Sequence, residues 1–285
     1  MKPTSPVRPT LTLGHSPDPD DAFMFYGLAA GRVDGRGWRF EHVLQDIQTL
    51  NERARRGELD VTAISIHAYP YVADRYALTA CGSSMGDGYG PLVVAREPME
   101  VGDLSGKLIA VPGEMTTAFL ALSLLLGRGG FRHEVVVFDR ILDHVAAGRA
   151  DAGLVIHEGQ LTYQNHRLHN VVDLGAWWKE RTGLPLPLGG NCIRRDHGRT
   201  DMEAIAAVLK ESIRFSLDHR SEAVEHALQY ARDMGRHLAD EFVGMYVNEW
   251  TVDYGPTGRA AVRELLRQGH AAGLVPWVGE IDFIG

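Results

Sequence analysis

Residues 11–21 read LTLGHSPDPDD, and this stretch sets the pattern for the rest of the chain. The apolar run Leu11–His15 predicts a strand. Two prolines then block a helix, and the acidic residues after them suit the first turn of a helix over about 22–30. A strand that passes through a short loop into a helix is the repeating unit of α/β proteins.

The same unit recurs along the chain in two sets. Strands are predicted at 38–43, 61–65, 91–96, 107–112, 135–138 and 153–156, and helices at 47–56, 118–126 and 141–147. Beyond an extended segment at 184–194, amphipathic helices are predicted at 202–217, 221–234 and 258–272. The pattern predicts an α/β fold with two lobes, each built on a parallel sheet, and a ligand cleft between them.

The extended segments near 91–96 and 186–193 are predicted to connect the lobes. We therefore expect residues 1–95 with 190–285 to form the first lobe and residues 96–189 the second. A length of 285 residues favours two domains. In such a fold the loops at the carboxyl ends of the strands converge on the ligand, so the candidate residues are sought there.

Charge and cysteine content exclude several classes of partner and site. The chain has 29 Lys and Arg against 37 Asp and Glu, a net charge of -8 that disfavours nucleic acid and anionic membranes. Cys81 and Cys192 lie far apart without a CxxC spacing, which argues against a structural zinc site or disulfide framework. The first nine residues lack a signal-peptide pattern, and no apolar run is long enough for a membrane span. We expect a cytoplasmic protein with a small-molecule ligand, while its oligomeric state stays open.

The first candidate loop, 16–21, combines a hydroxyl, three carboxylates and a helix start. Ser16 and the helix N–H groups could bind a polar or anionic ligand group. The alternative is a stiff turn with capping acids, and the residues alone do not decide. The carboxylates lack the spacing of a calcium loop, so no metal is predicted.

Two further strand ends carry hydroxyl groups. Ser65 could donate a hydrogen bond to a ligand, or it could only cap the following helix, which is the more common role. In the stretch 113–117, a glycine precedes Thr116 and Thr117 where a strand gives way to a helix, which suits a carboxylate or other anion. Capping is again the open alternative. Neither a phosphate-binding P-loop nor a dinucleotide motif is present, so no nucleotide cofactor is predicted.

His157 follows the apolar strand 153–156 and is predicted to face the cleft. The unperturbed pKa of histidine, about 6.5, suits proton abstraction at neutral pH. Most of the 13 histidines in such a chain are surface or satisfied residues, and that reading stays open for His157 on local evidence. The paired Trp177 and Trp178 could stack on a flat ligand but more often serve packing.

Several segments resemble the 1,4-dihydroxy-6-naphthoate synthase family of the futalosine route to menaquinone. The longest match is VDLGAWWKERTGLPLPLG at 172–189, and AGLVIHE at 152–158 and Arg140-Ile141-Leu142 also match. Shorter matches at 16–17, 46–51, 74–76, 90–96, 111–113 and 116–118 extend the resemblance over nearly the whole chain.

This resemblance implies a fold like that of type II periplasmic binding proteins. It also implies a cofactor-independent carbon-carbon lyase that converts cyclic de-hypoxanthine futalosine to 1,4-dihydroxy-6-naphthoate. The family's proton acceptor matches His157, and its ligand contacts match Ala63, Ile64, Ser65, Thr117 and Ala118. No metal is implied.

The chain departs from the family pattern at several cleft positions. Asp18, Asp20 and Ala22 stand where the family usually has Cys, Asn and Thr, and Ala63 stands where a lysine is common. The run 190–192 also differs. These changes make the cleft more negative. The alternative function is a non-catalytic binding protein for a small carboxylate; a chorismate-dehydrating relative fits less well because of the tryptophan-containing run.

Overall fold

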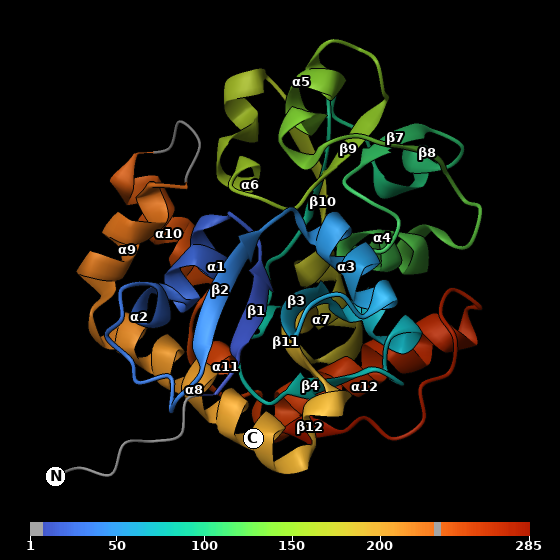
Figure 1. Cartoon of the computed structure of the whole chain (residues 1–285). Helices are drawn as coiled ribbons and strands as arrows, with labels where there is room; N and C mark the ends of the chain where they lie inside the picture. The colour runs from blue at the N-terminus through green and yellow to red at the C-terminus, as the bar shows by residue number, and fades with distance from the viewer. Residues whose placement is uncertain (1–7, 231–234) are drawn as a thin grey trace, which may run out of the picture.

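The computed structural model describes residues 8–230 and 235–285 and has two lobes, each built on its own sheet (Figure 1). The larger sheet has the strand order β12-β4-β11-β3-β1-β2, with β5 paired to β11. Its strands are β1 (Thr10–His15), β2 (Arg39–Leu44), β3 (Val61–Ser65), β4 (Tyr76–Thr79), β5 (Ser84–Gly86), β11 (Leu186–Arg194) and β12 (Phe283–Ile284).

The smaller sheet has the order β10-β6-β9-β7-β8. Its strands are β6 (Leu92–Ala95), β7 (Leu108–Val111), β8 (Arg132–Val135), β9 (Ala152–Val155) and β10 (His169–Asp173). Both α5 (Ile141–Ala146) and α6 (Gly159–Thr162) belong to this lobe, and α5 packs on β7 and β9.

Two groups of helices cover the larger sheet. The first group consists of α1 (Pro19–Met24), α2 (Tyr26–Ala29), α8 (Arg199–Asp218), α9 (Arg220–Leu228) and α10 (Arg236–Tyr246), which pack against one another on the left of Figure 1. The second consists of α3 (Ile47–Arg56), α4 (Thr117–Leu126), α7 (Leu174–Thr182), α11 (Glu249–Val252) and α12 (Gly255–Ala271). Short 3-10 helices lie at Ile66–Tyr71, Val101–Leu104, Phe138–Arg140, Tyr163–His166 and Arg195–His197.

Helix α3 shows how local sequence sets an element. The Asp46 side chain accepts a hydrogen bond from the Thr49 backbone N–H, which caps the helix, and Gly57 ends it in the left-handed conformation. Leu50 and Ala54, four residues apart, are both buried. The helix therefore begins and ends where the sequence predicts it.

The two lobes share one apolar core. Val93 and Leu154 of the smaller sheet and Leu78 and Cys192 of the larger sheet belong to the same buried cluster. The two chain connections between the sheets also touch. The Leu174 N–H donates to the Pro91 carbonyl, and a Cβ on Gly175 would lie only 1.8 Å from the Tyr89 carbonyl oxygen. Glycine at 175 is what lets the connections pass so closely.

The predicted α/β fold with two lobes is confirmed, but the sheets are mixed rather than parallel. The strands β6 and β11, which lie beside the two connections, run antiparallel to their neighbours, whereas β1–β3 and β7–β9 form parallel pairs. The sheets divide the chain between β5 and β6 and between α7 and β11. The domain limits at 95/96 and 189/190 stay predictions.

Several predicted elements were off by three residues at an end, among them the helix at 22–30 and the strand at 135–138. Helix α1 begins at Pro19 rather than near residue 22, because proline at the first helical position removes an N–H that has no partner there. The strand predicted at 135–138 lies earlier, as β8. β8 is an edge strand with exposed polar residues, and the apolar Val135 and Val137 that suggested the later position are exposed.

Several elements were not predicted, among them β10, α7 and α10. Part of the helix predicted at 221–234 is α9, and its last four residues lie outside the described part of the chain. Within residues 8–230 and 235–285, no helix is both long and apolar enough to cross a bilayer.

Candidate active site

A cavity lies where the two lobes meet and encloses about 730 Å³, counting its open mouth. Its walls come from both sheets and from α10, and they consist of Ser16, Asp18, Asp20, Asp21, Ile47, Ala63, Ile64, Ser65, Gly82, Ser84, Pro91, Thr116, Thr117, Ala118, Ile156, Leu188, Gly189, Gly190, Asn191, Phe242 and Tyr246.

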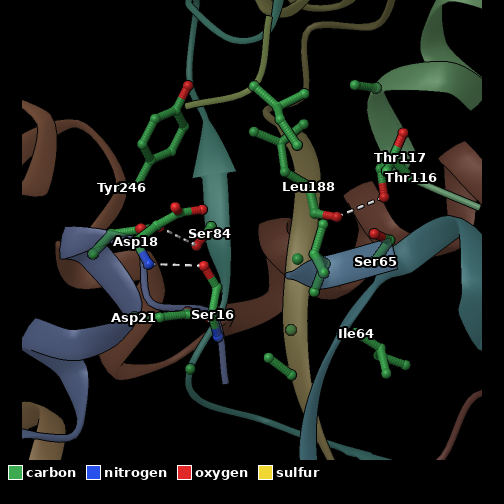
Figure 2. Close-up of a pocket in the computed structure, with 18 of the residues that line it drawn as sticks. Ser16, Asp18, Asp21, Ile64, Ser65, Ser84, Thr116, Thr117, Leu188 and Tyr246 are labelled. Carbon is green, nitrogen blue, oxygen red and sulfur yellow. Dashed lines mark hydrogen bonds between the residues drawn. The ribbon is translucent and has the colours of Figure 1, made fainter. Parts of the chain in front are cut away.

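All seven residues predicted to contact a ligand line this one cavity: Ser16, Ala63, Ile64, Ser65, Thr116, Thr117 and Ala118. They follow β1, end β3 or begin α4, so the loops at strand ends converge as the fold class predicts. Figure 2 shows Ser16, Ser84 and Tyr246 on one side of Leu188 and Ser65, Thr116 and Thr117 on the other. Their contact with a ligand stays a prediction.

Ser65 is held by an asparagine that the sequence analysis did not single out. Asn51 is fully buried on α3; its Nδ2 donates to Ser65 Oγ at 3.0 Å, and its Oδ1 accepts from the Ser65 backbone N–H at 2.8 Å. The Ser65 hydroxyl oxygen is thus an acceptor for Asn51, which leaves its own O–H to donate into the cavity. The sequence signal that could have identified Asn51 is an amide side chain next to the apolar Leu50 within the predicted helix 47–56.

The two threonine hydroxyls have structural partners. Thr116 Oγ1 donates to the Gly113 carbonyl and accepts from the Phe119 N–H, so it caps α4. Thr117 Oγ1 donates to the Leu188 carbonyl at 2.5 Å and accepts from the His67 N–H at 3.1 Å (Figure 2). The capping alternative therefore holds for the Thr116 side chain.

The start of α4 still offers donors to a ligand. The first N–H groups of a helix have no partner within it. Because Thr116 takes only the Phe119 N–H, the N–H groups of Thr117 and Ala118 are available at the cavity wall. Helix α4 has ten residues, and its first turn contains no acidic side chain. This edge suits a carboxylate.

The loop after β1 presents hydrogen-bond acceptors, in contrast to the donors at the start of α4. Asp21 Oδ2 accepts from the Ser16 backbone N–H at 2.7 Å, and Ser16 Oγ accepts from the Asp18 N–H at 2.9 Å. Burial and the neighbouring Asp18 raise the pKa of Asp20 to about 7, and burial together with Asp20 raises the pKa of Asp21 well above its usual value. The loop therefore suits a ligand group that donates hydrogen bonds rather than an anion.

His157 lies beside the cavity, next to the lining residue Ile156, but is not itself part of the wall. Its side chain is buried, with 5% of its surface exposed. The Gly159 N–H donates to Nδ1 at 3.0 Å, and Nδ1 also lies 3.6 Å from Glu158 Oε2. Nε2 lies 2.9 Å from the Phe138 carbonyl oxygen. The ring is thus oriented by contacts within the smaller lobe.

Gly159 is required by this arrangement. A Cβ at this position would lie 2.6 Å from the Cε1 atom of the His157 ring, closer than side-chain atoms approach. The ring also packs edge-on against Phe138, with centroids 5.4 Å apart. The sequence places the histidine at a strand end but gives no information on where its ring nitrogens point.

A hydrogen bond between α10 and α6 also joins the lobes. The Tyr246 hydroxyl on α10 donates to Gln160 Oε1 on α6 at 2.8 Å, and both side chains are buried. This pair was not predicted, because the sequence pattern indicated no helix at α10. Within the described residues, no group of three or more His, Cys, Asp or Glu side chains is arranged to hold a metal ion.

Comparison with known proteins adds sequence relatives and folds. Residues 11–271 match a family model described as menaquinone biosynthesis. The chain is 44% identical over 264 residues to a 1,4-dihydroxy-6-naphthoate synthase of Thermus thermophilus, covering 93% of this chain and 95% of the relative. It is 42% identical over 274 residues to a protein of the same name from Streptomyces coelicolor, covering 95% and 96%.

Solved structures agree with the fold. A crystal structure from Archaeoglobus fulgidus is 44% identical, covers 93% of this chain and 98% of its own, and superimposes with a TM-score of 0.88. The alkanesulfonate-binding protein of Xanthomonas axonopodis, bound to MOPS, has 14% identity, covers 96% of both chains and gives a TM-score of 0.67. That likeness shows the periplasmic-binding-protein fold.

Proposed function

The chain belongs to the menaquinone biosynthesis family, and on that premise we propose that it is a 1,4-dihydroxy-6-naphthoate synthase. As a carbon-carbon lyase it converts cyclic de-hypoxanthine futalosine to 1,4-dihydroxy-6-naphthoate. The observation that carries the proposal is the cavity between the lobes, where Ser65 and the start of α4 meet beside His157.

The substrate carboxylate binds at the start of α4 in this proposal. The N–H groups of Thr117 and Ala118 can donate to the carboxylate, and the Ser65 hydroxyl adds a third donor. Because Asn51, Leu188 and His67 hold these residues in place, the donors are oriented before a ligand arrives. Such preorganisation lowers the free energy needed to order the site.

His157 is the proton acceptor. Before substrate binds, its Nδ1 atom accepts a hydrogen bond from the Gly159 N–H. Proton transfer to Nδ1 replaces that hydrogen bond, so substrate binding and a shift of the segment 157–160 are coupled. Loss of the proton to His157 starts breakdown of the spiro-cyclic substrate. The electron pair left behind cleaves a carbon–carbon bond, the sugar-derived fragment is released, and formation of the aromatic bicycle drives the reaction.

The reaction class supports a cytoplasmic location and no nucleic-acid partner, in line with a net charge of -8. The alternative of a non-catalytic binding protein is not favoured, because both curated relatives are synthases. The solute-binding proteins share with this chain only the fold.

The test is turnover of cyclic de-hypoxanthine futalosine followed by mass spectrometry of 1,4-dihydroxy-6-naphthoate. We expect product from the wild type and a loss of between about 10²- and 10⁴-fold in kcat for His157→Ala, the range typical of a general base. The matched control is His169→Ala, an exposed histidine of the same lobe. Wild type without product rejects the function, and His157→Ala with full turnover rejects the base.

A further inference from the structure

We propose that Asp20, Ser84 and Asn191 form a hydroxyl-binding subsite that holds the sugar-derived part of the substrate, at the end of the cavity away from α4. This inference rests on the proposed function, because it assigns the second half of the same substrate. It makes the three residues determinants of specificity and of substrate orientation.

These three residues form one continuous wall. Ser84 Oγ donates to Asp20 Oδ2 at 3.3 Å, which ties β5 to the loop after β1. β5 pairs with β11 so that Ser84 lies opposite Gly189, two residues before Asn191. The Asn191 Nδ2 donates to the Gly82 carbonyl at 3.3 Å. This hydrogen bond ties Asn191 to the segment that leads into β5, two residues before Ser84.

Asn191 supplies the observation that points to a ligand. It lines the cavity with only 1% of its surface exposed. Its Oδ1 is buried and, within the part of the chain that the structure describes, has no hydrogen-bond partner. A buried amide oxygen without a partner is unfavourable, so a ligand group that donates a hydrogen bond there gains affinity.

The chemistry of the wall selects a hydroxyl group. Asn191 Oδ1 is an acceptor, whereas a hydroxyl ligand can both donate to it and accept from a neighbour. The raised pKa of Asp20, about 7, keeps part of its carboxyl protonated at neutral pH, so it too can donate or accept. A substrate carboxylate would meet acceptors here and is excluded in favour of α4.

The two ends of the cavity therefore select two different parts of one molecule. The product 1,4-dihydroxy-6-naphthoate retains the carboxylate but carries none of the aliphatic hydroxyl groups of the sugar-derived part. A subsite for that part must bind the substrate and contribute nothing to binding of the product. This difference separates a specific hydroxyl subsite from a general effect on the shape of the cavity.

The experiment compares wild type with Asn191→Leu, which keeps the volume and removes both polar atoms. We expect a KM for cyclic de-hypoxanthine futalosine about 10-fold higher, the typical effect of one lost hydrogen bond to a buried group. The Kd of 1,4-dihydroxy-6-naphthoate, measured by calorimetry, should stay within about 2-fold. Ser84→Ala, a smaller change, should act in the same direction. Asn170→Leu, at an exposed position of β10, is the control.

A second arm does not need turnover. Glycerol, a small polyol, is titrated into wild type and Asn191→Leu by NMR, and we expect weaker binding to the variant. If KM and glycerol affinity are unchanged, or if product binding falls as much as substrate binding, the subsite is rejected. If the wild type makes no product, the proposed function fails while the glycerol arm alone decides the subsite.

Discussion

The turns after β1 and after β7 have the same topology and opposite chemistry. Each follows a strand that lies in a parallel pair, leads into a helix and lines the same cavity. In each turn, a histidine Nδ1 also lies within hydrogen-bond distance of a backbone carbonyl oxygen. The distance is 2.9 Å from His15 to the Ser16 oxygen and 3.0 Å from His67 to the Thr116 oxygen. Burial lowers the pKa of both histidines, to about 3 and about 4, so both rings are neutral.

What differs is the helix that each turn begins. α1 has six residues, starts with proline and two acids, and has no side-chain cap. α4 has ten residues, is capped by Thr116 and has no acid in its first turn. One turn therefore presents acceptors and the other donors. The fold therefore sets the position of a ligand, while a few side chains in the turns set its orientation.

The largest effect is expected when the α4 turn is given the charge of the α1 turn. Ala118→Asp places a carboxylate where the substrate carboxylate is expected, and we expect kcat/KM to fall at least about 100-fold, about 2.7 kcal/mol, because two buried like charges repel. The helix itself should not be destabilised, since a negative charge suits its N-terminus. Ala118→Ser is the control, and Ala118→Asp with turnover within about 3-fold of wild type would contradict the assignment.

A smaller effect tests the difference in capping. Thr116→Ala removes the cap of α4 and should lower the free energy of unfolding in urea by about 1 kcal/mol. Asp18→Ala removes a side chain that makes no capping hydrogen bond to α1, so we expect a loss of less than about 0.5 kcal/mol. Equal losses in the two variants would show that the turns do not differ in this way.

A further test of the loop after β1 concerns pH. The pKa of Asp20 rises from 3.8 in the unfolded chain to about 7 in the folded one, so between these values the folded form holds a proton that the unfolded form releases. The contribution of Asp20 to stability therefore decreases as the pH rises from about 4 to about 7.

Asp20→Asn removes this dependence. Relative to wild type, the variant should be more stable at about pH 8 than at about pH 5, as measured by urea unfolding at both values. The exposed Glu97→Gln is the matched control. A stability difference between Asp20→Asn and wild type that is the same at both pH values would mean that Asp20 is not held in this environment.

The strands and helices around the site were predicted better than the side-chain contacts within it. The strand-turn-helix units at β1, β3 and β7 follow from local periodicity, and they bring the predicted ligand residues to one cavity. The hydrogen bonds that hold the site together instead join positions far apart in the sequence: Thr117 with Leu188, and Tyr246 with Gln160. No local pattern encodes such pairs, and the direction of the His157 ring depends on a carbonyl 19 residues away.

The order of the strands along the chain has a consequence for folding. The smaller sheet consists of strands between residues 92 and 173, so all its partners are close in sequence. The larger sheet needs β11 and β12, and Tyr26 on α2 reaches Glu222 on α9, 196 residues later. Contacts of such high sequence separation form slowly. During synthesis the smaller lobe can complete its sheet first, whereas the larger lobe must wait for the last part of the chain.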